Sequence, residues 1–124
     1  MEVIEREAGD VTILVLNGRL VLEDLDAQLR PTLEALIQRG RLKLVLDVTN
    51  VSYIDSAGVG FLVSKYVSAH RRGGGIKLVH VTPRVARVLE ITSLSRVFES
   101  FDTQQQAVQA FERAPGPEDL SPSP

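Results

Sequence analysis

The sequence predicts an α/β sandwich with a mixed, partly parallel sheet of four to five strands and about four helices. Short segments rich in Val, Ile and Leu alternate with longer segments of helical periodicity, which is the order of β-α-β units. Residues 42–48 are a nearly continuous apolar run, typical of a buried central strand. Residues 57–72 carry apolar side chains at positions i, i+3, i+4 and i+7, which predicts an amphipathic helix that ends at three glycines.

The first twenty residues read as short strands separated by turns. Each predicted strand is rich in Val, Ile, Leu or a similar β-forming residue, and a glycine follows each of the first two. The strands are residues 3–6, residues 11–16 and, as a candidate return strand, residues 19–21, with turns at Gly9-Asp10 and Asn17-Gly18.

A helix is predicted next, with Asp26 as a candidate cap and the last turn near Arg39. Its apolar residues share one helical face, and Gly40 is a candidate C-cap. Pro31 is unfavourable past the first turn because proline lacks the amide hydrogen. Either the helix begins later, near Arg30, or it bends, and the sequence leaves both alternatives open. The residues of the apolar face are Leu29, Leu33, Leu36 and Ile37.

The second half of the chain continues the alternation of strands and helices. After the glycines come a strand, a helix that begins at a proline, another strand, and a helix capped by Asp102 or Thr103. Four of the six prolines fall in residues 114–124, which lack periodicity and are predicted to be a disordered tail after a domain of residues 1–113. The four elements are residues 76–81, 84–91, 97–101 and a helix to about Arg113.

Composition excludes several classes of protein. The 124 residues include no cysteine, so disulfides, thiolate zinc sites and a cysteine nucleophile are excluded. A net charge of -2 and an aromatic content of 5% argue against a nucleic-acid-binding domain. No apolar run is long enough to span a membrane, and the N-terminus does not resemble a secretory signal. We therefore expect a cytoplasmic protein that binds neither membrane nor nucleic acid.

The segment of residues 47–60 carries the candidate chemistry. We expect it to be a polar loop between the central strand and the amphipathic helix, a place where ligands gather in open α/β sheets. Asp47 and Thr49 end the predicted strand, and Asp55 and Ser56 begin the helix. Asp55 or Ser56 could be the helix N-cap. Alternatively, Ser56 is a phosphate acceptor, because the positive end of the helix would stabilise the added charge.

Small residues at the start of this helix also have two interpretations. Gly58, Gly60, Ser64 and Ser68 lie off the main apolar stripe, where they would let the backbone of a partner approach. Alternatively, the glycines allow the helix to pack closely on the sheet.

Residues 47–60 resemble the signature of the STAS domain family, the anti-sigma factor antagonists. That signature has an aspartate, a serine or threonine two residues later, and then an apolar-Asp-Ser-small-Gly-apolar-Gly block, as in Ile54-Asp55-Ser56-Ala57-Gly58-Val59-Gly60. The resemblance covers residues 2–112. Its further matches are Gly18, Gly73-Gly74-Gly75-Ile76-Lys77-Leu78, Thr82-Pro83-Arg84-Val85 and Leu89-Glu90-Ile91-Thr92-Ser93-Leu94.

The resemblance implies a STAS-like fold and a phosphorylation-switched protein-binding function in a bacterial signalling system that regulates transcription. In the family, the unphosphorylated antagonist binds an anti-sigma factor that is also a GHKL-type serine kinase, which frees the sigma factor. The kinase phosphorylates the family serine, here Ser56, and a PP2C-type phosphatase resets it. The resemblance implies no enzyme activity, cofactor or metal, and we expect a monomer or weak dimer. It assigns partner binding to Asp55, Ser56, Ala57, Gly58 and Gly60, and positioning of the loop to Asp47 and Thr49.

Two departures from the family pattern bear on function. Residues 20–26 differ from the shorter family pattern near the partner surface, which leaves the identity of the partner open. Ala57 stands where serine or threonine is common, which removes one alternative acceptor and favours Ser56 as the phosphorylated residue. The alternative function is a scaffold or sensor subunit of a signalling complex or a transporter.

Other chemistries are disfavoured by spacing. His70 lies fourteen residues after Ser56 on the same predicted helix, about 20 Å away, and no nucleophile elbow is present for a hydrolase that would use His80. The triple glycine at residues 73–75 follows a helix and precedes a strand, the reverse of a phosphate-binding loop. The two histidines and the scattered carboxylates show no spacing typical of a metal site.

Overall fold

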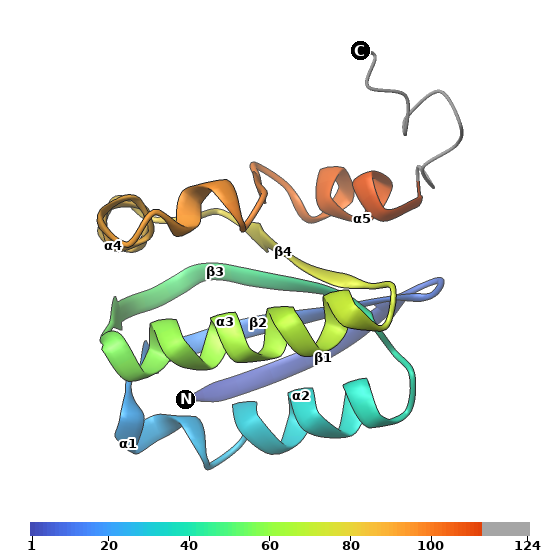
Figure 1. Ribbon diagram of the computed structural model, residues 1–124, viewed down its shortest axis with the longest axis horizontal. Coiled ribbons are helices and arrows are strands. Elements are labelled where there is room, and N and C mark those ends of the chain that lie inside the picture. The colour runs from blue at the N-terminus through green and yellow to red at the C-terminus, as the bar shows by residue number, and fades with distance from the viewer. Residues whose placement is uncertain (113–124) are drawn as a thin grey trace.

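A five-stranded mixed sheet forms the centre of the protein (Figure 1). The computed structural model describes residues 1–112. The strands lie in the order β1-β2-β3-β4-β5, with β1 antiparallel to β2 and the other neighbours parallel. Their bounds are β1 Glu2–Ala8, β2 Val11–Leu20, β3 Lys43–Ile54, β4 Gly75–Val79 and β5 Ser100–Phe101.

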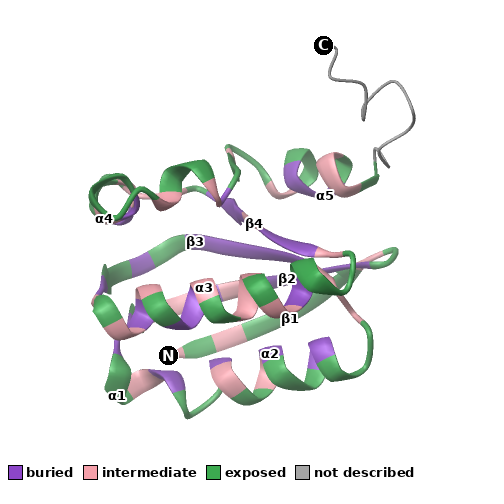
Figure 2. Ribbon diagram, viewed as in Figure 1, coloured by how far each residue is buried: buried purple, intermediate pink, exposed green. Residues whose placement is uncertain are grey.

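Helices cover both faces of the sheet unequally. Alternate residues of β2, β3 and β4 face the larger core, where Leu14, Leu44 and Leu78 pack against α1 to α4. The intervening residues face a smaller core that α5 covers. The helices are α1 Leu22–Leu25, α2 Leu29–Gln38, α3 Ser56–Arg71, α4 Pro83–Ile91 and α5 Gln104–Glu112, with a 3₁₀ turn, η1, at Leu94–Arg96. Figure 2 shows the consequence: β3 and β4 are largely buried, while each helix has a buried and an exposed side.

The α/β architecture is confirmed, and the main differences concern where strands end. Residues 17–21 do not form a turn and a return strand, because β2 continues to Leu20. Gly18 instead has a φ of 132° beside an irregularity in the β2–β3 register, and a Cβ there would lie 3.2 Å from the Cα of Met1. Such a backbone conformation favours glycine.

The predicted loop after the central strand is also strand. β3 runs to Ile54 and stays paired with β2, with two register shifts that each place one extra residue on β3. Val51 and Ile54 point into the core from this extension, which explains why a largely polar segment is still ordered as strand.

Helix α2 begins at Leu29, so Pro31 lies in its first turn, where no intrahelical amide bond is lost. Gln28 precedes it without a side-chain cap, and Asp26 instead pairs with Arg30 at 2.5 Å. Asp26 is therefore not the cap that we predicted. The preceding turn, α1, was not predicted and is the additional helix.

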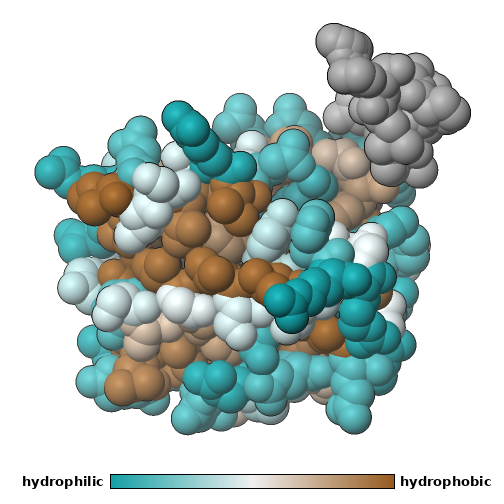
Figure 3. Space-filling view, viewed as in Figure 1, coloured by the Kyte–Doolittle hydropathy of each residue, from teal (hydrophilic) through white to brown (hydrophobic). Residues whose placement is uncertain are grey.

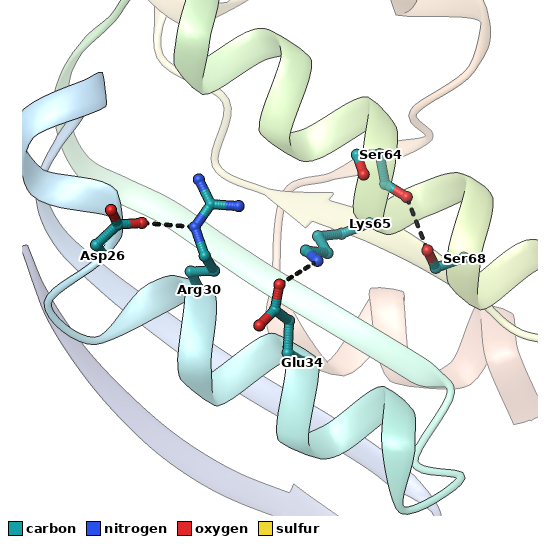
Figure 4. A network of polar contacts seen from close by, with 6 residues as sticks. All are labelled: Asp26, Arg30, Glu34, Ser64, Lys65 and Ser68. Carbon is teal, nitrogen blue, oxygen red and sulfur yellow. Dashed lines mark hydrogen bonds and ion pairs between the residues drawn. The ribbon is translucent and has the colours of Figure 1, made fainter.

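Helices α2 and α3 lie side by side on the larger core (Figure 1). Figure 4 shows the polar contacts here: Lys65 Nζ binds Glu34 Oε2 at 2.9 Å across the two helices, and the Ser68 hydroxyl donates to the Ser64 carbonyl at 3.1 Å. Phe61 is buried between these charges, with the Arg30 guanidinium 5.0 Å from its ring centroid. Helices α2 and α3 pack against each other and against the sheet, and this packing positions the start of α3. None of the helices in residues 1–112 is long and apolar enough to cross a membrane.

Candidate partner-binding site

The N-terminus of α3 is capped by Asp55. Asp55 has extended backbone angles, and its Oδ1 accepts a hydrogen bond from the Gly58 amide at 2.8 Å. Its Oδ2 accepts a second bond from the Leu22 amide at 3.3 Å, which ties the start of α1 to the start of α3. The Asp55 amide donates to the Leu20 carbonyl at 3.1 Å. Of the two candidate caps in the sequence, the structure therefore selects Asp55.

Ser56 is the first residue of α3 and is exposed. Among residues 1–112, its hydroxyl has no hydrogen-bond partner. The free amides and the dipole of a 16-residue helix begin at this position, so a negative charge here is stabilised electrostatically. The geometry thus combines an accessible hydroxyl with a backbone that tolerates an added phosphate.

The two glycines of the motif have different roles. Gly58 is buried, and a Cβ there would clash with the Leu20 carbonyl oxygen and lie 3.1 Å from Ile54 Cγ1. Its lack of a side chain lets α3 pack against the end of β2, so our placement of Gly58 on the partner surface is wrong. Gly60 is exposed with nothing within 4 Å of a Cβ, and it lies on the outer face one turn after Ser56.

The surface around Ser56 also contains residues that the sequence analysis missed. Leu22 and Tyr53 are among the exposed large apolar side chains, with exposed fractions of 62% and 45%. Leu22 lies beside Asp55 through their hydrogen bond, and Tyr53 precedes Asp55 by two residues on β3. The Arg84 guanidinium lies over the Tyr53 ring, 5.6 Å from its centroid. Ala57 is half-buried at the same helix start. Exposed aromatic side chains and arginines, such as Tyr53 and Arg84, are enriched at protein-binding surfaces.

Asp47 and Thr49 do not position a loop at this site. Both lie inside β3, where Asp47 Oδ1 accepts bonds from the Thr49 amide at 3.0 Å and the Thr49 hydroxyl at 2.5 Å. Asp47 Oδ2 accepts from Gln104 Nε2 at 2.7 Å, which joins β3 to the start of α5. Burial raises the pKa of Asp47, but these hydrogen bonds and the nearby His80 outweigh burial and leave the pKa below its ordinary value. The carboxylate links α5 to the sheet and lies just before the first register shift of β3, since Asp47 still pairs with Val15.

The histidines do not assemble a reaction centre with Ser56. His70 stacks on Tyr66 near the far end of α3, with ring centroids 5.3 Å apart. His80 follows β4 and contributes to the field at Asp47. In the part of the chain that the structure describes, no three His, Asp or Glu side chains are grouped as a metal site.

Comparisons with known proteins show the family and agree with the fold. The family model of the STAS domain matches residues 3–107. A candidate anti-sigma factor antagonist of Thermotoga neapolitana is 33% identical over 100 residues, 81% of this chain and 88% of that protein. The anti-sigma-B factor antagonist of Listeria monocytogenes is 30% identical over 103 residues, 80% of this chain and 85% of its own. The crystal structure of a candidate anti-sigma factor antagonist from Thermotoga maritima superposes with a TM-score of 0.83 at 29% identity, covering 90% of this chain and 95% of that one.

Proposed function

The chain belongs to the STAS domain family, and we propose that it acts as an anti-sigma factor antagonist that binds its partner while Ser56 is unphosphorylated. Relatives that bear the name anti-sigma factor antagonist support this role over most of the chain length. In the proposed role, the partner is an anti-sigma factor with GHKL-type serine kinase activity. Binding releases a sigma factor and so regulates transcription.

The observation that carries the proposal is the division of labour between Asp55 and Ser56. Asp55 caps α3, so the Ser56 hydroxyl is not needed as the cap. The Ser56 side chain is exposed. A phosphate there adds a charge of about -1.5 to -2 and is accommodated by the helix N-terminus. The domain therefore stays folded when Ser56 is phosphorylated, and only the charge of the binding surface changes. A local change of charge on a folded domain can switch partner binding on and off.

The same proposal assigns the chemistry to other proteins. The kinase partner would transfer the phosphate, and a PP2C-type phosphatase would remove it, so this chain needs no catalytic group of its own. We propose that it is a non-enzymatic, cytoplasmic binding protein. The position of His70 at the opposite end of α3 from Ser56 supports the absence of a hydrolytic triad.

The test uses two bait proteins, Ser56→Ala and Ser56→Asp, in the lysate of the source organism. The Ala bait is expected to retain a kinase, identified by mass spectrometry as GHKL-type, and the Asp bait is expected to lose it. Ser95→Asp, an exposed serine in η1, controls for added charge away from the site and should retain the kinase. Equal capture by the Ala and Asp baits would contradict the switch and favour a scaffold function.

A further inference from the structure

A basic patch lies beside the Ser56 surface on helix α4. We define it as Arg84 and Arg87, which are one turn apart and exposed, together with Tyr53, over whose ring the Arg84 guanidinium lies at 5.6 Å from the centroid. A shallow, open depression of about 480 Å³ lies on this face of α4 and is also lined by Pro83, Ala86 and Glu90. The face of the Tyr53 ring attracts the guanidinium, which favours this position of Arg84.

The charge of this basic patch is not compensated within the described part of the chain. Six other basic side chains in residues 1–112 have a carboxylate within 4.0 Å, whereas Arg84 and Arg87 have none, a property that they share with Arg6, Arg39, Arg71, Arg72 and Arg96. Glu90, one turn after Arg87, is likewise outside these ion pairs. The whole chain has a net charge of -2, whereas the two neighbouring arginines make this part of the surface locally positive. The paired side chains are Arg19, Arg30, Arg41, Lys43, Lys65 and Lys77.

The fold places this patch on the same edge as Ser56. Strands β3 and β4 are parallel, so α3 and α4, which follow them, both begin at the carboxyl edge of the sheet (Figure 1). Helix α4 contacts β3, and Tyr53 lies three residues before Ser56 on the chain. In Figure 3, brown apolar residues gather on the viewed face between α3 and α4, rimmed by hydrophilic side chains. A protein that covers Ser56 and this apolar area therefore also reaches α4.

We propose that the basic patch binds an acidic segment of the same partner that covers Ser56. The inference rests on the proposed function and adds the chemistry of the partner surface. Guanidinium groups pair with carboxylates in bidentate geometry, and charge complementarity of this kind raises association rates and selects partners. A phosphate on Ser56 places negative charge on the same edge, where it repels the acidic segment and competes for the arginines. Phosphorylation then weakens two contacts with the partner, the one at Ser56 and the one at the basic patch.

The test uses hexaglutamate peptide as the acidic probe and the full chain at low ionic strength. Titration is followed by ¹⁵N NMR, with the peptide expected to shift amides of residues 83–88 and of Tyr53. The double variant Arg84→Gln/Arg87→Gln should raise the dissociation constant about fivefold, as expected for the loss of two exposed ion pairs. The matched double variant Arg39→Gln/Arg71→Gln removes the same charge from exposed arginines at the opposite edge and should change it less than about twofold.

Two further arms separate this inference from the proposed function. Ser56→Asp should weaken peptide binding about twofold, because it adds one negative charge to the same edge. A hexalysine peptide should leave the amides of residues 83–88 unshifted. The inference is overturned if hexaglutamate shifts map elsewhere or if both double variants weaken binding equally. The bait experiment does not vary the arginines. If the Ser56→Ala bait captures the kinase but hexaglutamate does not bind the basic patch, the proposed switch is supported and only the role of the basic patch is refuted.

Discussion

Adding a methyl group at Gly58 tests how the start of α3 is positioned. A Cβ at Gly58 would clash with the Leu20 carbonyl oxygen, lie 2.9 Å from the Leu20 carbonyl carbon and lie 3.1 Å from Ile54 Cγ1, all closer than the 3.4–4 Å of ordinary contact. The backbone of β2 cannot yield as a side chain would, so overpacking costs about 3 kcal/mol. Alanine returns about 1 kcal/mol of helix propensity. Gly58→Ala should therefore lose about 2 kcal/mol of unfolding free energy, or about 8 °C in Tm.

Gly60→Ala is the matched control, two residues later in the same helix. Nothing lies within 4 Å of a Cβ at Gly60, so the substitution should gain about 0.5–1 kcal/mol and raise Tm by about 2–4 °C. Both values are measured by thermal and urea unfolding of the purified variants followed by circular dichroism. The reasoning is refuted if Gly58→Ala melts within about 1 °C of the parent or if both variants lose equal stability.

Three other substitutions test the site and its supports. Ser56→Ala should melt within about 2 °C of the parent because Ser56 is not the cap, whereas Asp55→Ala should lose about 1–2 kcal/mol. An equal loss for both in a urea titration would restore Ser56 as a structural residue. The pKa of Asp47 is lowered on folding, so its stabilisation is full above the unfolded value near 3.8 and is lost as pH falls through the lower folded value. Asp47→Asn should therefore cost about 1–3 kcal/mol at pH 7 and flatten the stability profile below about pH 4. Gln104→Ala should lower the free energy of unfolding by about 1 kcal/mol and should partly flatten the dependence of stability on pH in acid. If neither the Asp47 variant nor the Gln104 variant changes the acid profile, the Asp47 carboxylate does not hold α5.

Local signals sufficed to predict the elements that depend on neighbours in the chain. Helix α3 was predicted within one residue at each end, because Asp55 caps it and Gly73, with a φ of 97°, ends it. Of the two predicted caps of α5, Asp102 and Thr103, the structure selects Thr103, whose hydroxyl accepts from the Gln106 amide at 3.1 Å. The predicted tail of residues 114–124 lies outside the described residues.

The features that the sequence did not reveal depend on distant partners. Asp47 and Gln104 are 57 residues apart, and no local pattern predicts that a β3 carboxylate binds the start of α5. The extension of β3 depends on pairing with β2, and Gly18 looks the same in a hairpin turn and in an irregular strand. Arg84 could be recognised as part of the site only once the sheet had brought α4 to Tyr53.

The central claim is that phosphorylation of Ser56 switches partner binding without unfolding the domain. The most direct measurement compares the dissociation constant of the captured kinase for the purified chain with a hydroxyl and with a phosphate at Ser56. Circular dichroism of both forms verifies that the fold is kept. The account predicts at least about tenfold weaker binding of the phosphorylated form, a difference of about 1.4 kcal/mol, at unchanged secondary structure. Equal affinities, or a phosphorylated form that has unfolded, would contradict it.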